Sequence, residues 1–174
     1  MAEFELERTY LAKYLPENIS QASHKQITDL YIPSDREQAK LRVRKSEDNY
    51  EITKKVLVNK NDASVQIEYT IPLDREEYQV FSHIPARRIE KIRYDYQYIS
   101  YNAQIDVFQL NLLGLVLVDF EFKTQEKLLQ FIMPDFCLVD VTQEQFIAGG
   151  KLCGKNYEDI EDELLKFSYH KLLL

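Results

Sequence analysis

The feature that most constrains this chain is a repeated alternation of charged and apolar side chains. The sequence begins M-A-E-F-E-L-E-R-T-Y-L, with Glu3, Glu5 and Glu7 at every second position and Phe4 and Leu6 between them. Successive side chains of a strand point to opposite faces, so the carboxylates share one face and the apolar pair shares the other. Taken alone, this pattern is also typical of a strand with one face in solvent.

The same alternation recurs with basic residues. Arg42 and Arg44 share one face of L-R-V-R, and Lys91 and Arg93 share one face of K-I-R-Y. Lys55 falls on the polar face of Y-E-I-T-K-K. Ordinary solvent-facing strands mix neutral and charged residues, whereas these segments carry charge at consecutive positions of one face, sorted by sign. The sorting indicates a shared environment for the charged faces.

Acids return late in the chain, with Asp106 in I-D-V-F and with Asp119 and Glu121 in V-D-F-E-F. If the strands close into a barrel with their apolar faces outward under the helices, the charged faces line the lumen. Such a lumen suits a polyanion, because Arg and Lys bind phosphate oxygens and carboxylates hold Mg²⁺ or Mn²⁺.

Eight alternating segments separated by turn residues predict the strands of one sheet. The segment K-N-D at 60–62 is typical of a hairpin turn. Short strands in hairpin-like succession, with few helices, predict an α+β fold in which an eight-stranded antiparallel β-barrel has a few helices packed outside. The expected strands are Glu3–Leu11, Gln26–Tyr31, Ala39–Arg44, Tyr50–Val56, Val65–Ile71, Arg88–Tyr96, Tyr98–Val107 and Leu115–Phe122.

Helices are predicted from their capping residues. Asp74 begins a capping-box-like segment, and Thr124 can cap a helix that ends before Pro134. Asn156 can cap a last helix, and a shorter turn is expected after Pro16.

Composition limits the classes of function. With 174 residues, 45% of them apolar, the chain is expected to be a single domain, residues 1–174. The net charge of −7 argues against a nucleic-acid partner. Without a bilayer-length apolar run or a signal peptide, we expect no membrane association and a cytoplasmic location. Cys137 and Cys153 are expected to be reduced core residues, and the scattered histidines argue against zinc.

The order of these motifs resembles that of the triphosphate tunnel metalloenzymes, the CYTH superfamily. The opening E-L-E-R-T is similar to the Glu-x-Glu-x-Lys strand of that family, and Tyr31 precedes the Arg-x-Arg strand as a substrate-proximal tyrosine does there. One Glu-x-Glu is unspecific, but the order of motifs along nearly the whole chain is specific. The segments that resemble family strands are Glu5–Leu11, Leu41–Arg44, Thr53–Lys55, Ile67–Pro72, Arg88–Tyr94, Ile105–Phe108, Val118–Phe122 and Asp140–Thr142.

The resemblance implies a tunnel that binds a small-molecule triphosphate with Mg²⁺ or Mn²⁺ and hydrolyses it. It implies metal binding by Glu5 and Glu7, with Asp106, Asp119 and Glu121 on the opposite wall. The phosphate-binding residues that it implies are Arg42, Arg44, Lys55, Lys91, Arg93 and Lys151. The residues that it places at the catalytic step are Tyr31, Thr9 and Lys55.

Three departures from the family pattern affect these expectations. Thr9 stands where the family has a lysine, which removes a cation and a possible partner for Tyr31. Gln66 and Thr70 stand where acids are common. The segment around Lys151 matches only loosely. Thr9 therefore predicts weak triphosphatase activity or a shifted pH optimum.

Several functions remain open at this point. The leading hypothesis is hydrolysis of inorganic triphosphate or of a small organic triphosphate. Adenylate cyclase and thiamine triphosphatase are alternatives within the same fold. Because Thr9 replaces the lysine, a module that binds triphosphate or polyphosphate without cleaving it is an alternative from another class. A third class is a structural barrel that binds no ligand. The chain is expected to be a monomer or a homodimer.

Overall fold

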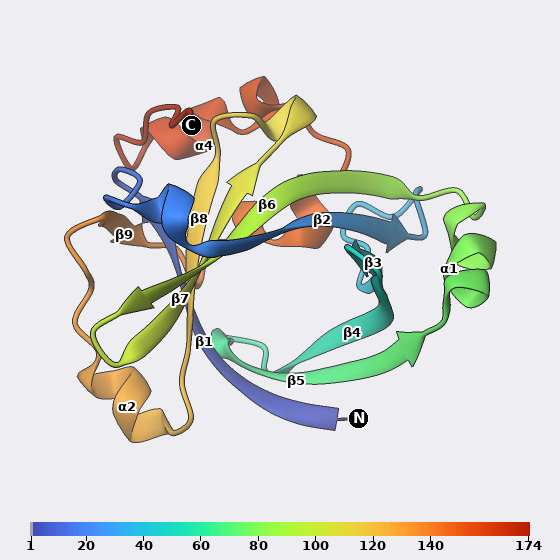
Figure 1. The fold of residues 1–174 in the computed structure, drawn as a ribbon, viewed down its shortest axis with the longest axis horizontal. Coiled ribbons are helices and arrows are strands. Elements are labelled where there is room, and N and C mark those ends of the chain that lie inside the picture. Colours follow the sequence, from blue (N-terminus) through green and yellow to red (C-terminus); the bar gives the residue numbers. More distant parts are fainter. Residues whose placement is uncertain (1) are drawn as a thin grey trace.

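The computed structural model describes residues 2–174 and contains a closed antiparallel β-barrel (Figure 1). Around the barrel the strands follow the order β5-β4-β3-β2-β6-β7-β8-β1, and β1 also pairs with β5, which closes the ring. The predicted eight-stranded antiparallel barrel is therefore confirmed. The strands are β1 Ala2–Ala12, β2 Ser23–Ile32, β3 Leu41–Ser46, β4 Asn49–Asn59, β5 Asp62–Leu73, β6 Arg87–Tyr98, β7 Tyr101–Phe108, β8 Val116–Glu121 and β9 Cys137–Asp140.

The first strand, β1, closes the barrel because it is long enough to pair with three neighbouring strands. Its first half pairs with β5 over Ala2–Leu6, and its second half pairs with β8 over Glu7–Leu11. The last residues, Tyr10–Ala12, also pair with β9. The strand β9 was not predicted, although it contains the beginning of the family's Val-Thr segment.

The helices begin where their capping residues predicted. Asp74 forms a capping box with Glu77 at the start of α1, and Thr124 accepts a hydrogen bond from the backbone of Lys127 in α2. Asn156 forms a capping box with Asp159, but the segment first makes a 3₁₀ turn and only then becomes α4. The helices are α1 Arg75–Ser82, α2 Gln125–Gln130, α3 Gly149–Leu152 and α4 Glu161–Leu165, with 3₁₀ turns at Ile19–Gln21, Leu110–Leu112, Gln145–Ile147 and Tyr157–Asp159.

Two apolar clusters surround the barrel. One lies on the outer face of β7 and β8, where Val118 and Phe120 are buried beneath Leu128 of α2 and Phe131. The other lies where the C-terminal segment packs on the barrel, around Leu117 and Leu152. The first cluster buries apolar side chains that point outward from the barrel, whereas Leu117 and Leu152 of the second cluster also line the interior cavity.

The expectation that helices cover the apolar outer faces is wrong for one side of the barrel. On β1 and β5, Phe4 is 74% exposed, Ile71 is 60% exposed and Tyr69 is 46% exposed. The helix α1 contacts β3 and β4, and α2 contacts β1, but these residues of β1 and β5 stay exposed. No helix within residues 2–174 is long and apolar enough to cross a membrane.

Candidate active site

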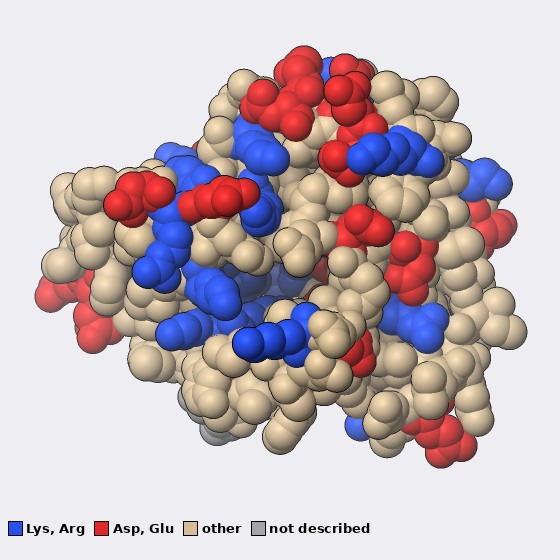
Figure 2. Space-filling model, turned by 180° about the vertical axis from the view of Figure 1, so that it is seen from behind, with Lys and Arg blue, Asp and Glu red and all other residues tan. Residues whose placement is uncertain are grey.

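The interior of the barrel holds a cavity of about 470 Å³. A space-filling view shows a hollow in the surface with Lys and Arg side chains gathered around it (Figure 2). All but one of the residues that sequence analysis assigned to the site line this cavity, as the alternation predicted. The lining includes Glu5, Glu7, Thr9, Tyr31, Arg42, Arg44, Lys55, Lys91, Arg93, Asp106, Asp119 and Glu121.

Lys151 is the predicted site residue that does not line the cavity. It lies in α3 and forms an ion pair with the exposed carboxylate of Glu37. The neighbouring Gly149 and Gly150 do line the cavity.

The strand order divides the lining into two walls. The basic wall comprises Arg42 and Arg44 on β3 and Lys91 and Arg93 on β6, with β2 between these strands. The acidic wall comprises Glu5 and Glu7 on β1, Asp119 and Glu121 on β8 and Glu68 on β5, with β1 between the other two. The expectation that the first and last acids lie on opposite walls is wrong, because Glu7 and Glu121 are direct cross-strand partners.

On the basic wall, a buried carboxylate holds Arg44 in place. Asp29 on β2 is 2% exposed and accepts two hydrogen bonds from the guanidinium of Arg44, Nε to Oδ1 at 2.7 Å and Nη2 to Oδ2 at 2.8 Å. Burial by itself would raise the pKa of Asp29, but Arg44 and Arg42 outweigh it and hold that pKa well below its usual range. A bidentate pair of this kind fixes the orientation of the arginine.

Asp106 does the same for the other half of the basic wall. Its carboxylate accepts hydrogen bonds from Nε and Nη2 of Arg93, both at 2.7 Å, and from the ammonium of Lys91. Although burial raises the pKa of Asp106, Arg93 and Lys91 lower it below its usual range. Both oxygens of Asp106 are therefore engaged by cations, which argues against the predicted metal-binding role.

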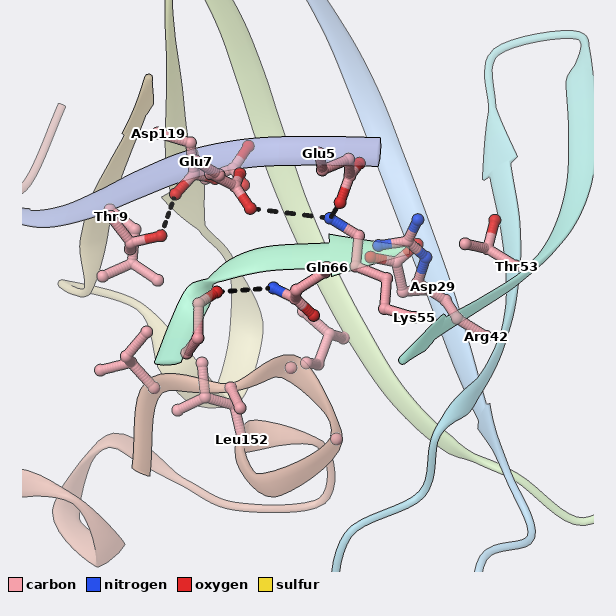
Figure 3. A pocket seen from close by; sticks show the side chains of 18 of the residues that line it. Glu5, Glu7, Thr9, Asp29, Arg42, Thr53, Lys55, Gln66, Asp119 and Leu152 are labelled. Atoms are coloured by element: carbon pink, nitrogen blue, oxygen red, sulfur yellow. Dashed lines mark hydrogen bonds and ion pairs between the residues drawn. The ribbon is translucent and has the colours of Figure 1, made fainter. Parts of the chain in front are cut away.

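On the acidic wall, a lysine stands among carboxylates from two strands. Lys55 Nζ lies 2.6 Å from Glu5 Oε2, 3.6 Å from Glu7 Oε2 and 3.5 Å from Glu68 Oε2 (Figure 3). Even with this cation beside it, burial raises the pKa of Glu5 to about 7. One ammonium therefore does not neutralise the cluster.

Thr9 faces the lumen, as its parity with Glu5 and Glu7 predicted. Its hydroxyl donates a 2.8 Å hydrogen bond to Oδ1 of Asp119 (Figure 3). Burial and then the charge of Glu7 raise the pKa of Asp119 to about 7. The threonine gives this carboxylate a neutral hydrogen bond where the family pattern has a cation.

Tyr31 lies on the edge of the cavity and is packed beneath the C-terminal segment. A Cβ atom at Gly149 would stand 1.9 Å from the hydroxyl of Tyr31, so only glycine permits this contact. Burial raises the pKa of Tyr31 to about 12. A phenol with this pKa does not act as a base near neutral pH.

The segment 142–152 lies across one end of the barrel and contacts strands on several sides. Thr142 accepts a hydrogen bond from the backbone of Thr9, and the side chain of Gln143 accepts one from the backbone of Ala63. A Cβ atom at Gly150 would stand 2.1 Å from the carbonyl oxygen of Ala39. These contacts hold the segment against the cavity, which it lines.

Comparison with solved structures supports the same architecture. The crystal structure of the inorganic triphosphatase NE1496 aligns with 86% of this chain and 93% of its own, at 23% identity and a TM-score of 0.62. A second structure of NE1496 aligns at 24% identity, with 87% and 99% coverage and a TM-score of 0.63. The chain has the fold of NE1496.

A more distant structure also shares this fold. A candidate adenylate cyclase from Bacillus halodurans covers 99% of the chain and 94% of its own length, at 16% identity and a TM-score of 0.56. No protein-family model matches the chain, and no curated protein matches its sequence.

The structure places in the cavity lining two acidic residues that sequence analysis did not assign to the site, Asp29 and Glu68. Asp29 anchors Arg44, and Glu68 is the third carboxylate around Lys55. The signal for Asp29 was present, because it lies two residues before Tyr31 and so on the same face of the strand. Its partner, however, comes from the register of β2 with β3, which pairs Asp29 with Arg44.

The acidic wall is suited to a divalent metal by the chemistry of its donors. Carboxylate oxygens are hard ligands that fit Mg²⁺ or Mn²⁺. The cavity lining holds nine acidic and six basic side chains, so the cavity carries excess negative charge. A polyanion bound there would add to this charge, which a divalent cation would offset. Within residues 2–174, no three such side chains are arranged as a ready-made metal site. Mg²⁺ often takes only one or two carboxylates and completes its shell with phosphate oxygens and water.

Proposed function

We propose that this chain is a metal-dependent triphosphatase of the triphosphate tunnel family, which hydrolyses inorganic triphosphate or a small organic triphosphate inside the barrel. The observation that carries the proposal is the pair of facing walls in one cavity of the barrel. Fixed guanidinium and ammonium groups on the basic wall match phosphate oxygens, and the clustered carboxylates of the acidic wall match a divalent cation. The shared fold with NE1496 supports the same activity.

In this proposal, the basic wall binds the phosphates. Arg44 and Arg93 are held by Asp29 and Asp106 with their guanidinium groups at the cavity surface. Because the pairs are already formed, little side-chain entropy is lost when the triphosphate binds. We assign Asp29 and Asp106 as positioning residues, since each acts through the cations that it orients.

The acidic wall would hold the metal through Glu5, Glu7, Asp119 and Glu121. When bound, Mg²⁺ or Mn²⁺ would neutralise the triphosphate and polarise the phosphorus that water attacks. Phosphoryl transfer depends mainly on positioning and on charge stabilisation, which are what the two walls supply. Thr9 would orient Asp119 by its hydrogen bond, while Tyr31 contributes to the cavity lining.

A second candidate function follows from Thr9. A threonine hydroxyl supplies neither the charge nor the proton transfer of the lysine found in the family pattern. The same cavity could then bind a triphosphate without cleaving it. Thiamine triphosphatase and adenylate cyclase remain alternatives. The first differs in the organic group of the substrate, and the second in the reaction, because a ribose hydroxyl attacks the α-phosphorus of ATP and diphosphate leaves.

Phosphate release from inorganic triphosphate, ATP and thiamine triphosphate, each with Mg²⁺ and with Mn²⁺, tests the proposal. Diphosphate, cyclic AMP and thiamine diphosphate are measured in the same reactions to separate the alternatives. We expect metal-dependent release of phosphate that is lost in Arg42→Ala. Binding without any product would favour the non-catalytic module, and the absence of binding would overturn the proposal.

A further inference from the structure

Lys55 differs from the other cations of the tunnel in the partners that it has. The carboxylates of Glu5, Glu7 and Glu68 stand 2.6, 3.6 and 3.5 Å from its Nζ atom. Two of these three carboxylates, Glu5 and Glu7, are the ones that the opening motif assigns to the metal. The ammonium of Lys55 therefore lies beside the same two carboxylates to which the divalent metal would bind.

Apart from Arg42, whose Nη2 lies 3.7 Å from Glu68 Oε2, the cations of the basic wall have partners of another kind. Arg44 is bound to Asp29, and Lys91 and Arg93 are bound to Asp106. Neither Asp29 nor Asp106 is a carboxylate that we assign to the metal. Arg93 also approaches Asp119 at 3.6 Å, but its bidentate pair with Asp106 fixes it.

We propose that Lys55 is a resident counter-ion that competes with the divalent metal for Glu5 and Glu7 and leaves them when the triphosphate binds. This inference rests on the proposed function for the identity of the incoming anion. The competition between Lys55 and the metal, however, depends only on the carboxylates.

The competition follows from charge and geometry. An ammonium donates up to three hydrogen bonds, and here it stands within 4 Å of three carboxylate oxygens. A divalent ion bound to Glu5 or Glu7 would lie close to this ammonium and be repelled by it. The metal can bind only after the ammonium has moved away or at the cost of that repulsion.

The side chain of Lys55 is able to move. Lysine carries its charge on a flexible four-carbon stem, whereas an arginine in a bidentate pair is fixed. Arg42 on the neighbouring strand β3 also lines the cavity, so phosphate oxygens bound there would lie within the same lumen. A triphosphate that attracts the ammonium would free the carboxylates for the metal. Metal and triphosphate would then bind with positive coupling, each increasing the affinity for the other.

Titration of the protein with Mn²⁺ alone, followed by electron paramagnetic resonance, tests this inference. We expect Lys55→Met to bind Mn²⁺ at least about ten-fold more tightly than the wild type, which corresponds to about 1.4 kcal/mol. Lys54→Met is the matched control, because Lys54 neighbours Lys55 on β4 but is exposed and does not line the cavity. It should leave the affinity unchanged, and Lys55→Arg, which keeps the charge, should not tighten binding.

Equal or weaker Mn²⁺ binding by folded Lys55→Met would overturn the inference, as would equal tightening in Lys54→Met. Thermal unfolding shows whether each variant is folded. Lys55→Gln, which keeps a hydrogen-bond donor without the charge, provides the same comparison if Lys55→Met does not fold. Because no triphosphate is present in the titration, a protein that fails to hydrolyse triphosphate would refute the proposed function and leave this result intact.

Discussion

The two walls of the cavity solve the problem of buried charge in different ways. On the basic wall each fixed cation has a buried carboxylate behind it, as with Arg44 and Asp29, and the pKa of Asp29 and Asp106 is lowered. On the acidic wall, burial raises the pKa of Glu5 and of Asp119 to about 7 despite the cations beside them, whereas Lys55 and the other neighbours of Glu68 outweigh its burial and lower its pKa. The fixed cations of the basic wall therefore have carboxylate partners, whereas the acidic wall has more carboxylates than cations.

This difference indicates that the two walls have separate roles in binding. Preformed ion pairs on the basic wall supply a fixed surface for phosphate oxygens. In the proposed function, a divalent cation would relieve the repulsion among the carboxylates of the acidic wall, and Lys55 would reduce this repulsion until the metal binds. Stability should therefore depend mainly on the basic wall, and metal affinity on the acidic wall.

The largest effect is expected from Asp29→Asn, which removes the charge behind Arg44. Breaking a buried pair while leaving one charge in place costs about 3–5 kcal/mol of unfolding free energy. Urea denaturation measures the loss. Glu121→Gln is the control on the acidic wall, since Glu121 is exposed and accepts a 3.2 Å hydrogen bond from the amide of Gln104. That variant should change stability by no more than about 0.5 kcal/mol. Equal losses in both variants would erase the distinction between the walls.

The next largest effect is expected for stabilisation by ligands, which should distinguish the role of the basic wall from that of the acidic wall. Triphosphate with Mg²⁺ or Mn²⁺ should raise the unfolding free energy by roughly 2–4 kcal/mol at concentrations well above the dissociation constant, and triphosphate alone should raise it less. Arg42→Ala should remove most of the total shift, because it removes a phosphate contact. Glu121→Ala should remove only the part that depends on the metal. Thermal shift assays with each component measure both effects, and an identical shift in all variants would mean that the ligand binds elsewhere.

Acid should destabilise the protein through the basic wall. Asp29 and Asp106 have lowered pKa values in the folded state, so their contribution is present above the unfolded value of about 3.9 and is lost as the pH falls below it. Each lowered unit corresponds to about 1.4 kcal/mol. Urea unfolding followed from about pH 4 downward, below the unfolded pKa, should show this decline, and Asp29→Asn should show a shallower one. An equally steep decline in that variant would assign the acid sensitivity to other groups.

The smallest effect is expected from adding a cation to the acidic wall. Thr9→Lys places an ammonium beside Asp119 and restores the lysine of the family pattern. We expect an increase of about ten-fold in the rate of phosphate release, less than the 10²–10⁴-fold that a well-positioned proton-transfer group supplies. Steady-state rates across pH with Mg²⁺ and with Mn²⁺ measure it, with Thr9→Val as a control that keeps the shape without the hydroxyl. A slower Thr9→Lys enzyme would show that the tunnel is organised around the threonine.

The alternation of charge predicted the barrel and the direction of its side chains. A period of two is a local property of extended backbone, so the inward positions of Glu5, Arg42 and Asp119 followed from each segment separately. The helix starts at Asp74 and Thr124 were likewise local, because a cap bonds to a backbone group three residues away. The resemblance to the tunnel family added the expected roles of these charged residues, but it placed the first and last acids on opposite walls, which is wrong.

The local sequence did not determine which charged side chains contact each other. The pairing of Thr9 with Asp119 joins residues 110 positions apart, and the contact of Lys55 with Glu5 depends on β5 lying between β4 and β1. Asp106 was expected at the metal, but the register of β6 and β7 sets it directly opposite Arg93. Lys151 was expected at the phosphates, but the packing of α3 leaves it outside the lining. Strand pairing decides these contacts because it is a non-local choice, made by the whole barrel when it closes, and no single segment encodes its partner.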